Sequence, residues 1–412
     1  MKASKYIPVL FLFICIFYLI SCPDSDEIES NIPIARAGED DTVQVGMYAI
    51  LDGSESYFGK NPYYQSLRWK SDENNSHEFP MFVLLKSQVG FVTEGVFNFI
   101  LTVYNSEGIS DSDTVTITVV PRTDGFFKDP CLDVAVRFTL DNPTIPITDE
   151  IISSLDTLYY ASIMRDKIST LEGLEKCVNL KILALLSQNI YTIDQISSLT
   201  NLEEVALNDN YISDLTPFEN LYKMKHLELI NNNISDTKGL ENLTELECLF
   251  LLSNPIENIA PMQNLINLTD LYFYGANLSE ITSLSGLTNL EVLWLAKCSV
   301  PEINSLKSLM NLKILNIRLN NISDISILSE LLKCERFYLS NNLIEDITPL
   351  SNLPEINFLD LADNKITDIK PLVDNSGIGK GDLVILSDNP LNDVSINSYI
   401  PLLISREVNV LY

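Results

Sequence analysis

The residue types that most often do chemistry are sparse in this 412-residue chain. Its two histidines, His77 and His226, lie far apart, and neither has a second histidine at metal-ligand spacing. Histidine-based metal sites and most histidine-based catalysis are therefore disfavoured. The seven cysteines include no CxxC pair and no zinc-like spacing. The sequence predicts a non-enzymatic protein with no catalytic residue, no metal site and no cofactor.

The charge of the chain excludes another class of partner. It has 27 Lys and Arg against 56 Asp and Glu, a formal charge of −29. Binding to a phosphate backbone depends on clustered Lys and Arg, so we expect no nucleic-acid partner. The 46% of apolar residues excludes a wholly disordered chain.

Residues typical of binding surfaces are more frequent than the histidines and cysteines typical of catalysis, and aromatic residues among them recur at a fixed interval. Phe250, Tyr272 and Trp294 follow one another 22 residues apart. Tyr, Trp and Arg are the residue types that most often carry binding energy at protein interfaces. The interval implies a repeated structural element that places the three rings in equivalent positions.

That element is a 22-residue unit, repeated ten times over residues 158–377. The two-residue step from Leu315 to Ile317 is typical of a strand with one inward face. The three-residue steps that follow favour 3₁₀ turns over a long α-helix. One unit buries too little to fold alone, whereas stacked units share their burial. We predict a solenoid with a parallel β-sheet on its concave face and 3₁₀ helices and loops on its convex face.

The spacing resembles the short leucine-rich repeats of the internalin family. The resemblance implies a column of amide side chains that satisfies backbone groups after each strand. Ala276 departs from the column and is expected to loosen its turn. Residues 121–157 are predicted as linker and N-terminal cap, and 378–412 as terminal repeat and C-terminal cap. The column is assigned to Asp166, Gln188, Asn210, Asn232, Asn254, Ala276, Cys298, Asn320, Asn342 and Asn364.

The candidate binding site follows from the direction of strand side chains. Positions 3, 5 and 7 of each unit must point away from the core, and neighbouring strands lie about 4.8 Å apart. The aromatic residues then form a ladder on the concave face, with acids on its N-terminal side and arginines on its C-terminal side. A protein partner, a glycan that stacks on the rings, or mere stiffening of the sheet remain open. The predicted protein-binding residues are Ile230, Phe250, Leu252, Tyr272, Tyr274, Trp294, Arg318, Arg336 and Tyr338.

Residues 32–120 contain short β-rich runs between turn signals, which predict an all-β sandwich. The runs at 51–56, 97–103 and 111–115 and Trp69 resemble a PKD-type (polycystic-kidney-disease) Ig-like module. Trp69 is expected in the inter-sheet core. The acids Asp40, Asp41, Asp111 and Asp113 are either solvated turn residues or a calcium site. A spacer or secondary adhesive role fits such a module.

The first 22 residues have the features of an export signal. A basic start and a short apolar run are typical of a signal peptide at 1–21. Leu19–Cys22 resembles a bacterial lipobox, which implies lipidation of Cys22 and a membrane anchor. Residues 22–31 then form an acidic tether. We therefore expect a surface-exposed, cell-envelope lipoprotein that binds a protein through the concave repeat face. A glycan-binding lipoprotein and a structural spacer are the alternatives.

Overall fold

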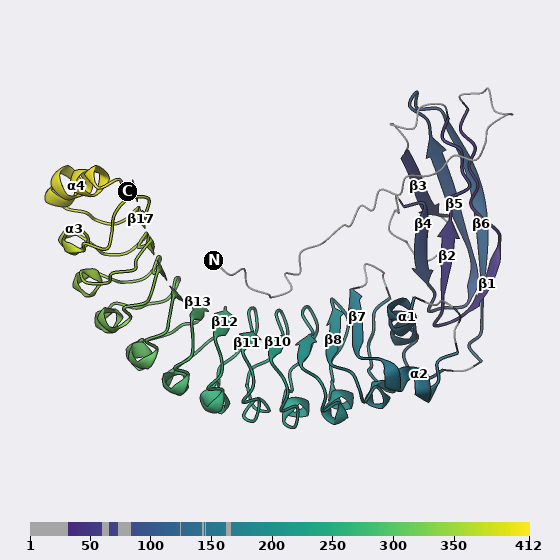
Figure 1. Ribbon diagram of the computed structural model, residues 1–412, viewed down its shortest axis with the longest axis horizontal. Helices are drawn as coiled ribbons and strands as arrows, with labels where there is room; N and C mark the ends of the chain where they lie inside the picture. The colour runs from purple at the N-terminus through teal and green to yellow at the C-terminus, as the bar shows by residue number, and fades with distance from the viewer. Residues whose placement is uncertain are drawn as a thin grey trace.

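The computed structural model describes residues 32–59, 66–72, 84–123, 125–141, 144, 146–161 and 166–412. The predicted signal segment, Cys22 and the tether to residue 31 lie outside the described residues. Two structural parts follow one another along the chain, an all-β module and a long arc of repeats (Figure 1). Within the described residues, no helix combines the length and apolar character needed to cross a membrane.

The N-terminal module consists of two β-sheets around one core. One sheet has the order β1-β6-β5-β3, and β2 pairs with β4 in the other. Trp69 is 1% exposed, and its Nε1 donates to the carbonyl of Leu84 at 3.2 Å, so its predicted core position is confirmed. The strands are β1 (Asp41–Gln44), β2 (Tyr48–Asp52), β3 (Ser66–Ser71), β4 (Lys86–Gly90), β5 (Gly95–Tyr104) and β6 (Ser110–Val120).

The aspartates of the module bind its own backbone. Asp111 and Asp113 each accept one amide of the N-terminal segment, from Ala35 at 2.9 Å and Ala37 at 2.8 Å. Asp40 accepts the amide of Thr116 at 2.7 Å. Among the described residues, no group of three or more His, Cys, Asp or Glu side chains is placed to hold a metal ion. The carboxylates thus fasten the start of the module to strand β6.

Two short helices cap the first repeat. In α1 (Pro130–Thr139), Pro130 occupies the first turn and the Asp129 side chain accepts the amide of Cys131. This is a favourable helix start, because Pro lacks an amide and the cap satisfies one that the helix leaves unpaired. In α2 (Asp149–Ser154), Thr148 plays the same capping role. The segment that precedes the first repeat is therefore helical.

The module packs directly on this cap. Tyr48 of β2 is fully buried, and its ring lies 4.5 Å from that of Phe138 in α1. Arg122 forms a 2.6 Å ion pair with Asp133, whose side chain is 4% exposed. Burying a charge in this way is costly unless it is paired, so the ion pair fixes where the two parts meet. Figure 1 places the module beside α1, at the N-terminal end of the arc.

The arc is a solenoid whose parallel strands line its inner side and whose short helices line its outer side (Figure 1). Twelve strands run from β18 at one edge to β7 at the other, in unbroken chain order. Each unit contributes inward-facing leucine or isoleucine to one continuous core. The strands are β7 (Thr157–Ala161), β8 (Ile182–Leu186), β9 (Glu204–Ala206), β10 (His226–Glu228), β11 (Cys248–Phe250), β12 (Asp270–Tyr274), β13 (Val292–Ala296), β14 (Ile314–Asn316), β15 (Arg336–Tyr338), β16 (Phe358–Asp360), β17 (Leu383–Ile385) and β18 (Asn409–Leu411).

The convex side is built largely from 3₁₀ turns, as the three-residue steps predicted. After the last of them come a short α-helix, a π-helical turn and the C-terminal helix, which closes the core before β18. These helices are η2 (Leu174–Lys176), η3 (Asp194–Ser198), η4 (Thr216–Phe218), η5 (Ala260–Asn264), η6 (Thr282–Gly286), η7 (Asn304–Ser308), η8 (Ser326–Glu330), η9 (Thr348–Leu350), α3 (Lys370–Asp374), η10 (Ser395–Tyr399) and α4 (Ile400–Ser405).

The strand register confirms the 22-residue period from β8 to β16 and corrects the phase of the first unit. Leu158 pairs with Leu183, not with Leu180. The first unit is therefore three residues longer than predicted, and Asp166 does not occupy the amide column. The physical reason is that the Leu158 side chain points into the core from within strand β7, as Leu183 does from β8. A leucine at position 1 of a unit precedes its strand and cannot take this place. The last step is likewise longer, because Leu359 pairs with Val384.

The predicted amide column is present from β8 onward. Asn342 illustrates it: its Nδ2 donates to the carbonyls of Ile317, Leu339 and Ser340, and its Oδ1 accepts the amide of Ile322. Backbone groups that the strands leave unpaired are thereby satisfied between neighbouring units. The same role falls to Gln188, Asn210, Asn232, Asn254, Asn320 and Asn364, and to Asn389 in the terminal repeat.

The two apolar substitutions in this column are compensated locally. At Ala276 the preceding Gly275 keeps the left-handed backbone (φ 76°) of the other units. The amide of Leu278 bonds the backbone carbonyl of Cys298 at 2.9 Å, in place of a side-chain oxygen. The Cys298 thiol in turn donates to the carbonyl of Ala296 at 3.2 Å. The turn therefore keeps its shape, with fewer side-chain hydrogen bonds.

Candidate functional site: the aromatic stripe of the concave face

Three aromatic side chains lie side by side on the concave face, as the period predicted. Phe250, Tyr272 and Trp294 are direct partners in the registers of β11, β12 and β13. The rings of Phe250 and Tyr272 stack at 4.5 Å with an interplanar angle of 6°. Tyr272 and Trp294 follow at 5.6 Å and 55°. Each ring is partly exposed.

The row continues beyond the next strand. Position 5 of β14 is Asn316, yet the rings of Trp294 and Tyr338 approach across it to 6.2 Å. Tyr338 then contacts Phe358 at 4.7 Å. Sequence reasoning missed Phe358 as a site residue, because it joins the row diagonally and not along the column that contains the other rings. We call Phe250, Tyr272, Trp294, Tyr338 and Phe358 the aromatic stripe.

The remaining predicted residues border the stripe. Ile230, Leu252 and Tyr274 stand at position 7 and are partly exposed, and the Lys297 ammonium lies 5.9 Å from the Tyr274 ring. Arg318 is partly exposed and Arg336 is exposed. The nine predicted binding residues thus lie within strands β11, β12, β13 and β15 or two residues after the ends of β10, β11 and β14.

The acids on the N-terminal side of the stripe are hydrogen-bonded within the protein. Glu228 accepts the Asn208 amide at 2.8 Å. Asp270 accepts the hydroxyls of Thr269 at 2.8 Å and of Tyr272 at 3.3 Å. These carboxylates hold neighbouring side chains in place.

Polar donors beside the stripe are left unpaired. Asn316 is fully buried, and its Nδ2 has no hydrogen-bond partner among the described residues. The Nε of Arg318, two residues further along, is also buried without an acceptor. Within the described chain, neither Arg318 nor Arg336 forms an ion pair. Unpaired buried donors are uncommon in folded proteins and call for an explanation.

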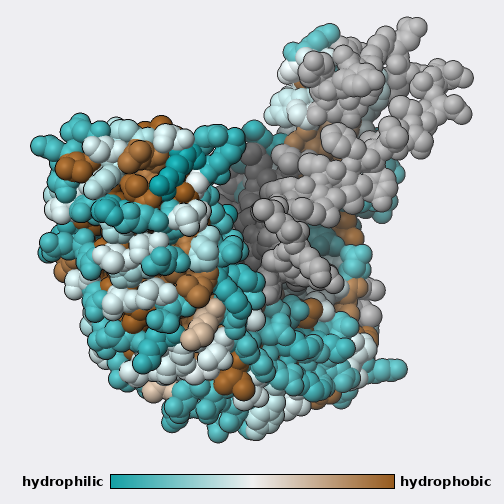
Figure 2. Space-filling view, turned by 60° about the vertical axis from the view of Figure 1, so that its left-hand side comes forward, coloured by the Kyte–Doolittle hydropathy of each residue, from teal (hydrophilic) through white to brown (hydrophobic). Residues whose placement is uncertain are grey.

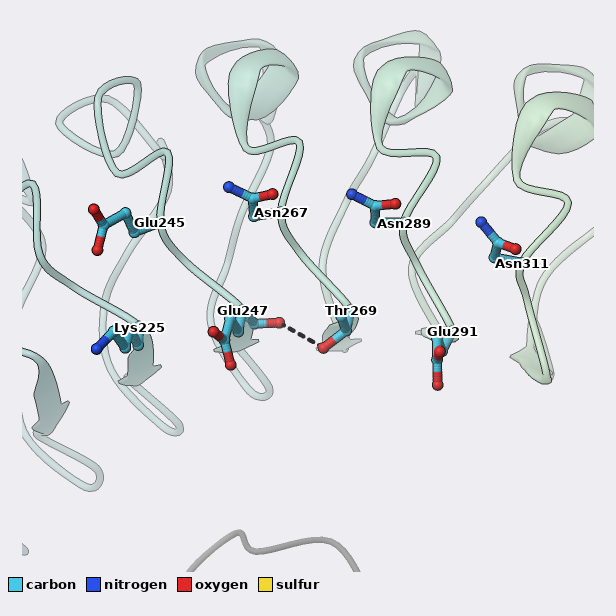
Figure 3. A pocket seen from close by; sticks show the side chains of 8 residues that line it. All are labelled: Lys225, Glu245, Glu247, Asn267, Thr269, Asn289, Glu291 and Asn311. Carbon is cyan, nitrogen blue, oxygen red and sulfur yellow. Dashed lines mark hydrogen bonds between the residues drawn. The ribbon is translucent and has the colours of Figure 1, made fainter. Parts of the chain in front are cut away.

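A second polar feature lies beside the sheet, at the start of the strands. It is a groove of about 640 Å³, lined by side chains of unit positions 22 and 2 (Figure 3). Asn267, Asn289 and Asn311 each donate to a backbone carbonyl of the preceding unit. They form a second asparagine ladder, which the sequence analysis did not identify although its 22-residue spacing was visible. The groove residues are Lys225, Glu245, Glu247, Asn267, Thr269, Asn289, Glu291 and Asn311.

The five cysteines of the described residues are free, buried thiols. Burial raises the pKa of Cys298 to about 11 and those of Cys177 and Cys334 to about 12. A thiol of raised pKa is a poor nucleophile at neutral pH. These residues serve packing.

Elsewhere the surface differs in character from the stripe. The face seen in Figure 2, with the C-terminal end of the arc forward, is mainly hydrophilic with hydrophobic residues in small separate groups. Scattered apolar residues of this kind are normal, whereas a contiguous apolar row with a polar border marks an interaction surface.

Comparison with known proteins agrees with this architecture. The family model described as "Leucine Rich repeats (2 copies)" matches residues 333–374. A search of curated proteins finds no match. An internalin (inlF) from Listeria monocytogenes is similar in structure, with a TM-score of 0.64 and 26% identity over 69% of this chain and 82% of that one.

Two further structures share the fold at lower identity. The functional domain of InlJ from Listeria monocytogenes, which includes a cysteine ladder, gives a TM-score of 0.55 and 22% identity over 69% of this chain and 60% of that one. The Arabidopsis receptor kinase HAESA, solved with the peptide hormone IDA and the co-receptor SERK1, gives 0.50 and 24% over 63% and 46%. The repeat match and the likeness to inlF indicate no enzymatic family, and they support an internalin-like leucine-rich-repeat protein.

Proposed function

We propose that this protein is a cell-envelope lipoprotein that binds a protein partner through the aromatic stripe. The observation that carries the proposal is a row of five partly exposed rings, in mutual contact, at the centre of the concave face. Burying such rings against a partner is favourable, and Tyr and Trp lose little side-chain entropy on binding. Arg318 and Arg336 add the charged border that interface hot spots use.

The geometry of the rings favours a protein over a glycan. A sugar stacks on a ring whose flat face is open to solvent. In the stripe, Phe250 and Tyr272 are stacked face to face at 6°, so each covers one face of the other. Ring edges and remaining faces form a ridged apolar surface, which suits the side chains of another protein.

The N-terminal part would hold this surface away from the membrane. We propose lipidation at Cys22 as the anchor, exposure of the protein at the cell surface, and a PKD-type identity for the all-β module. The Arg122–Asp133 ion pair and the Tyr48–Phe138 contact support a fixed attachment of the module to the repeat arc. A rigid spacer loses less entropy on binding than a flexible one.

The binding proposal is tested with libraries of cell-surface proteins and with glycan arrays. The wild-type chain is compared with the double variant Tyr272→Ala/Trp294→Ala. Removing two hot-spot rings should weaken protein binding by about 2 kcal/mol or more, which is roughly a thirtyfold change in Kd. The measurement is surface plasmon resonance against each protein identified.

A matched control removes a different aromatic pair. Tyr191 and Tyr211 stack at 4.8 Å and are 58% and 44% exposed, but they belong to the loops that follow the strands. Tyr191→Ala/Tyr211→Ala should leave the Kd unchanged. Equal losses in both double variants, or binding confined to glycans, would overturn the protein-binding proposal.

The anchor is tested separately by Cys22→Ala. The variant should leave the membrane fraction for the soluble fraction, because several acyl chains at one cysteine provide the stable attachment. If the variant still sediments with membranes and needs detergent for release, lipidation is not the tether.

A further inference from the structure

We propose that the concave face carries a carboxylate-binding subsite between Trp294 and Tyr338. Asn316 and Arg318 would receive the side chain of an Asp or Glu from the partner protein. The inference rests on the proposed function and specifies it, since it names the chemistry that the partner must present at one point of the stripe.

The orientation of Asn316 is fixed by its backbone neighbour. The Oδ1 of Asn316 accepts the amide of Arg318 at 3.2 Å. Turning the amide over would bring two donors together, so the unpaired end of the side chain is Nδ2. This end is a donor, and among the described residues it finds no acceptor.

The amide column shows that a buried asparagine with an unpaired donor is unusual in this solenoid. Asn320, four residues along the same chain segment, uses its Nδ2 on the carbonyls of Leu295, Ile317 and Arg318. Both side chains are buried, at 7% and 0% exposure. The Nδ2 of Asn320, on the loop edge, is fully hydrogen-bonded, whereas the Nδ2 of Asn316, within the aromatic stripe, has no acceptor among the described residues.

Two rings flank Asn316 on the neighbouring strands. Trp294 and Tyr338 belong to the strands on either side of Asn316, and their centroids are 6.2 Å apart at 45°. They are partly exposed, so they can rotate away toward the solvent. If the two rings moved apart, the carboxylate of an Asp or Glu from the partner could reach Asn316. The aliphatic part of that Asp or Glu side chain would stay in contact with the ring faces.

The surrounding charges select an acceptor that carries negative charge. Arg318 supplies a second buried donor, its Nε, two residues from Asn316, and Arg336 lies exposed on the next strand. Asp360, which pairs with Tyr338 in the strand register, already accepts the Ser340 hydroxyl at 2.7 Å and the Ala362 amide at 3.2 Å. Donors are therefore in surplus at this point, and a carboxylate would satisfy both donors and the guanidinium charge.

The test uses two libraries of linear peptides, displayed on phage and selected on the full chain. One library fixes a glutamate at the central position, and its twin fixes a glutamine there. The wild-type chain should enrich the glutamate library, because a charge-assisted pair is stronger than a neutral one. Changing that glutamate to glutamine in the recovered peptides should weaken the Kd by roughly tenfold to a hundredfold.

Asn316→Asp is the decisive variant, since it replaces the donor by an acceptor of the same shape. It should bind the recovered glutamate peptides at least about tenfold more weakly. Asn277→Asp makes the same change at an exposed asparagine away from the stripe and should bind as the wild type does. Circular dichroism melting of both variants establishes that they are folded.

Three results would overturn the subsite. They are equal enrichment of both libraries, recovery of no peptide, and unchanged binding to Asn316→Asp. If peptides bind without a need for glutamate and are lost on Tyr272→Ala/Trp294→Ala, the protein-binding function stands and only the carboxylate subsite falls. If the glutamate peptides bind equally well to the ring double variant and to Asn316→Asp, both fall.

Discussion

Buried asparagines at the loop edge and on the inner face of the same sheet differ in their hydrogen bonding. On the loop edge, Asn342 forms four hydrogen bonds, two of them with the preceding unit. On the inner face, Asn316 uses one atom and leaves the other unpaired under two rings. Both side chains are buried.

The contrast separates stability from recognition within one fold. A saturated buried amide stabilises the stack, because breaking it would strand several backbone groups at once. A buried donor without a partner, such as the Nδ2 of Asn316, contributes nothing to the stability of the free protein and even costs free energy. Such a cost is characteristic of places that a ligand completes. The same residue type can therefore be assigned opposite roles from its hydrogen bonds alone.

The largest expected effect comes from making one substitution at both places. Asn342→Asp replaces the amide group that donates to three carbonyls by a carboxylate oxygen that faces them, and it should reduce the free energy of unfolding by about 3–5 kcal/mol. Asn316→Asp keeps an oxygen for the Arg318 amide and adds a negative charge near the Arg318 guanidinium, so its change should stay within about 1 kcal/mol. Urea denaturation measures both values.

Hydrogen exchange gives a local check on this pair. The amide of Ile322, which bonds Asn342, should exchange much faster in Asn342→Asp and unchanged in Asn316→Asp. Similar losses of stability in the two variants would show that the two asparagines are not different in kind.

Much of this contrast could be predicted from the sequence, and the physical reason is the fixed period. An interval of 22 residues places Phe250, Tyr272 and Trp294 on adjacent strands, since a parallel register repeats with the unit. The amide column follows from the same arithmetic. Near the ends the period changes, so the phase at Leu158 was wrong by three residues.

The site itself was only partly predictable. Phe358 joins the stripe across a diagonal, which a column-by-column view does not reveal. The unpaired donor of Asn316 depends on how Trp294 and Tyr338 lean over it, and side-chain rotations of this kind are set by packing. The sequence indicated which face carries the rings, whereas the structure shows which donors are left unpaired among them.

A second prediction concerns Cys298, where a thiol stands in the amide column. Burial raises its pKa to about 11, against 9.0 for the ordinary thiol. The unfolded chain therefore loses this proton first, and the stabilising contribution of the protonated thiol, present below pH 9, is lost as the pH rises toward 11. Between pH 8 and pH 10.5, the unfolding free energy should fall by on the order of 1–2 kcal/mol more than in Cys298→Asn. Parallel pH profiles from urea titrations would contradict this.

The smallest effect should come from completing the amide column at Ala276. Asn in this position has the saturated arrangement of its neighbours available, because Gly275 already holds the required left-handed backbone. Ala276→Asn should therefore raise the free energy of unfolding by about 1 kcal/mol, the usual net value of an added buried hydrogen bond. Ala296→Asn, at a fully buried position of the inner face, adds the same side chain without such partners and should destabilise instead. Opposite signs in the two variants would extend the contrast between loop edge and inner face to positions where the chain has no asparagine. A gain in stability for Ala296→Asn would contradict this, because burial alone, and not the amide column, would then decide what an asparagine contributes.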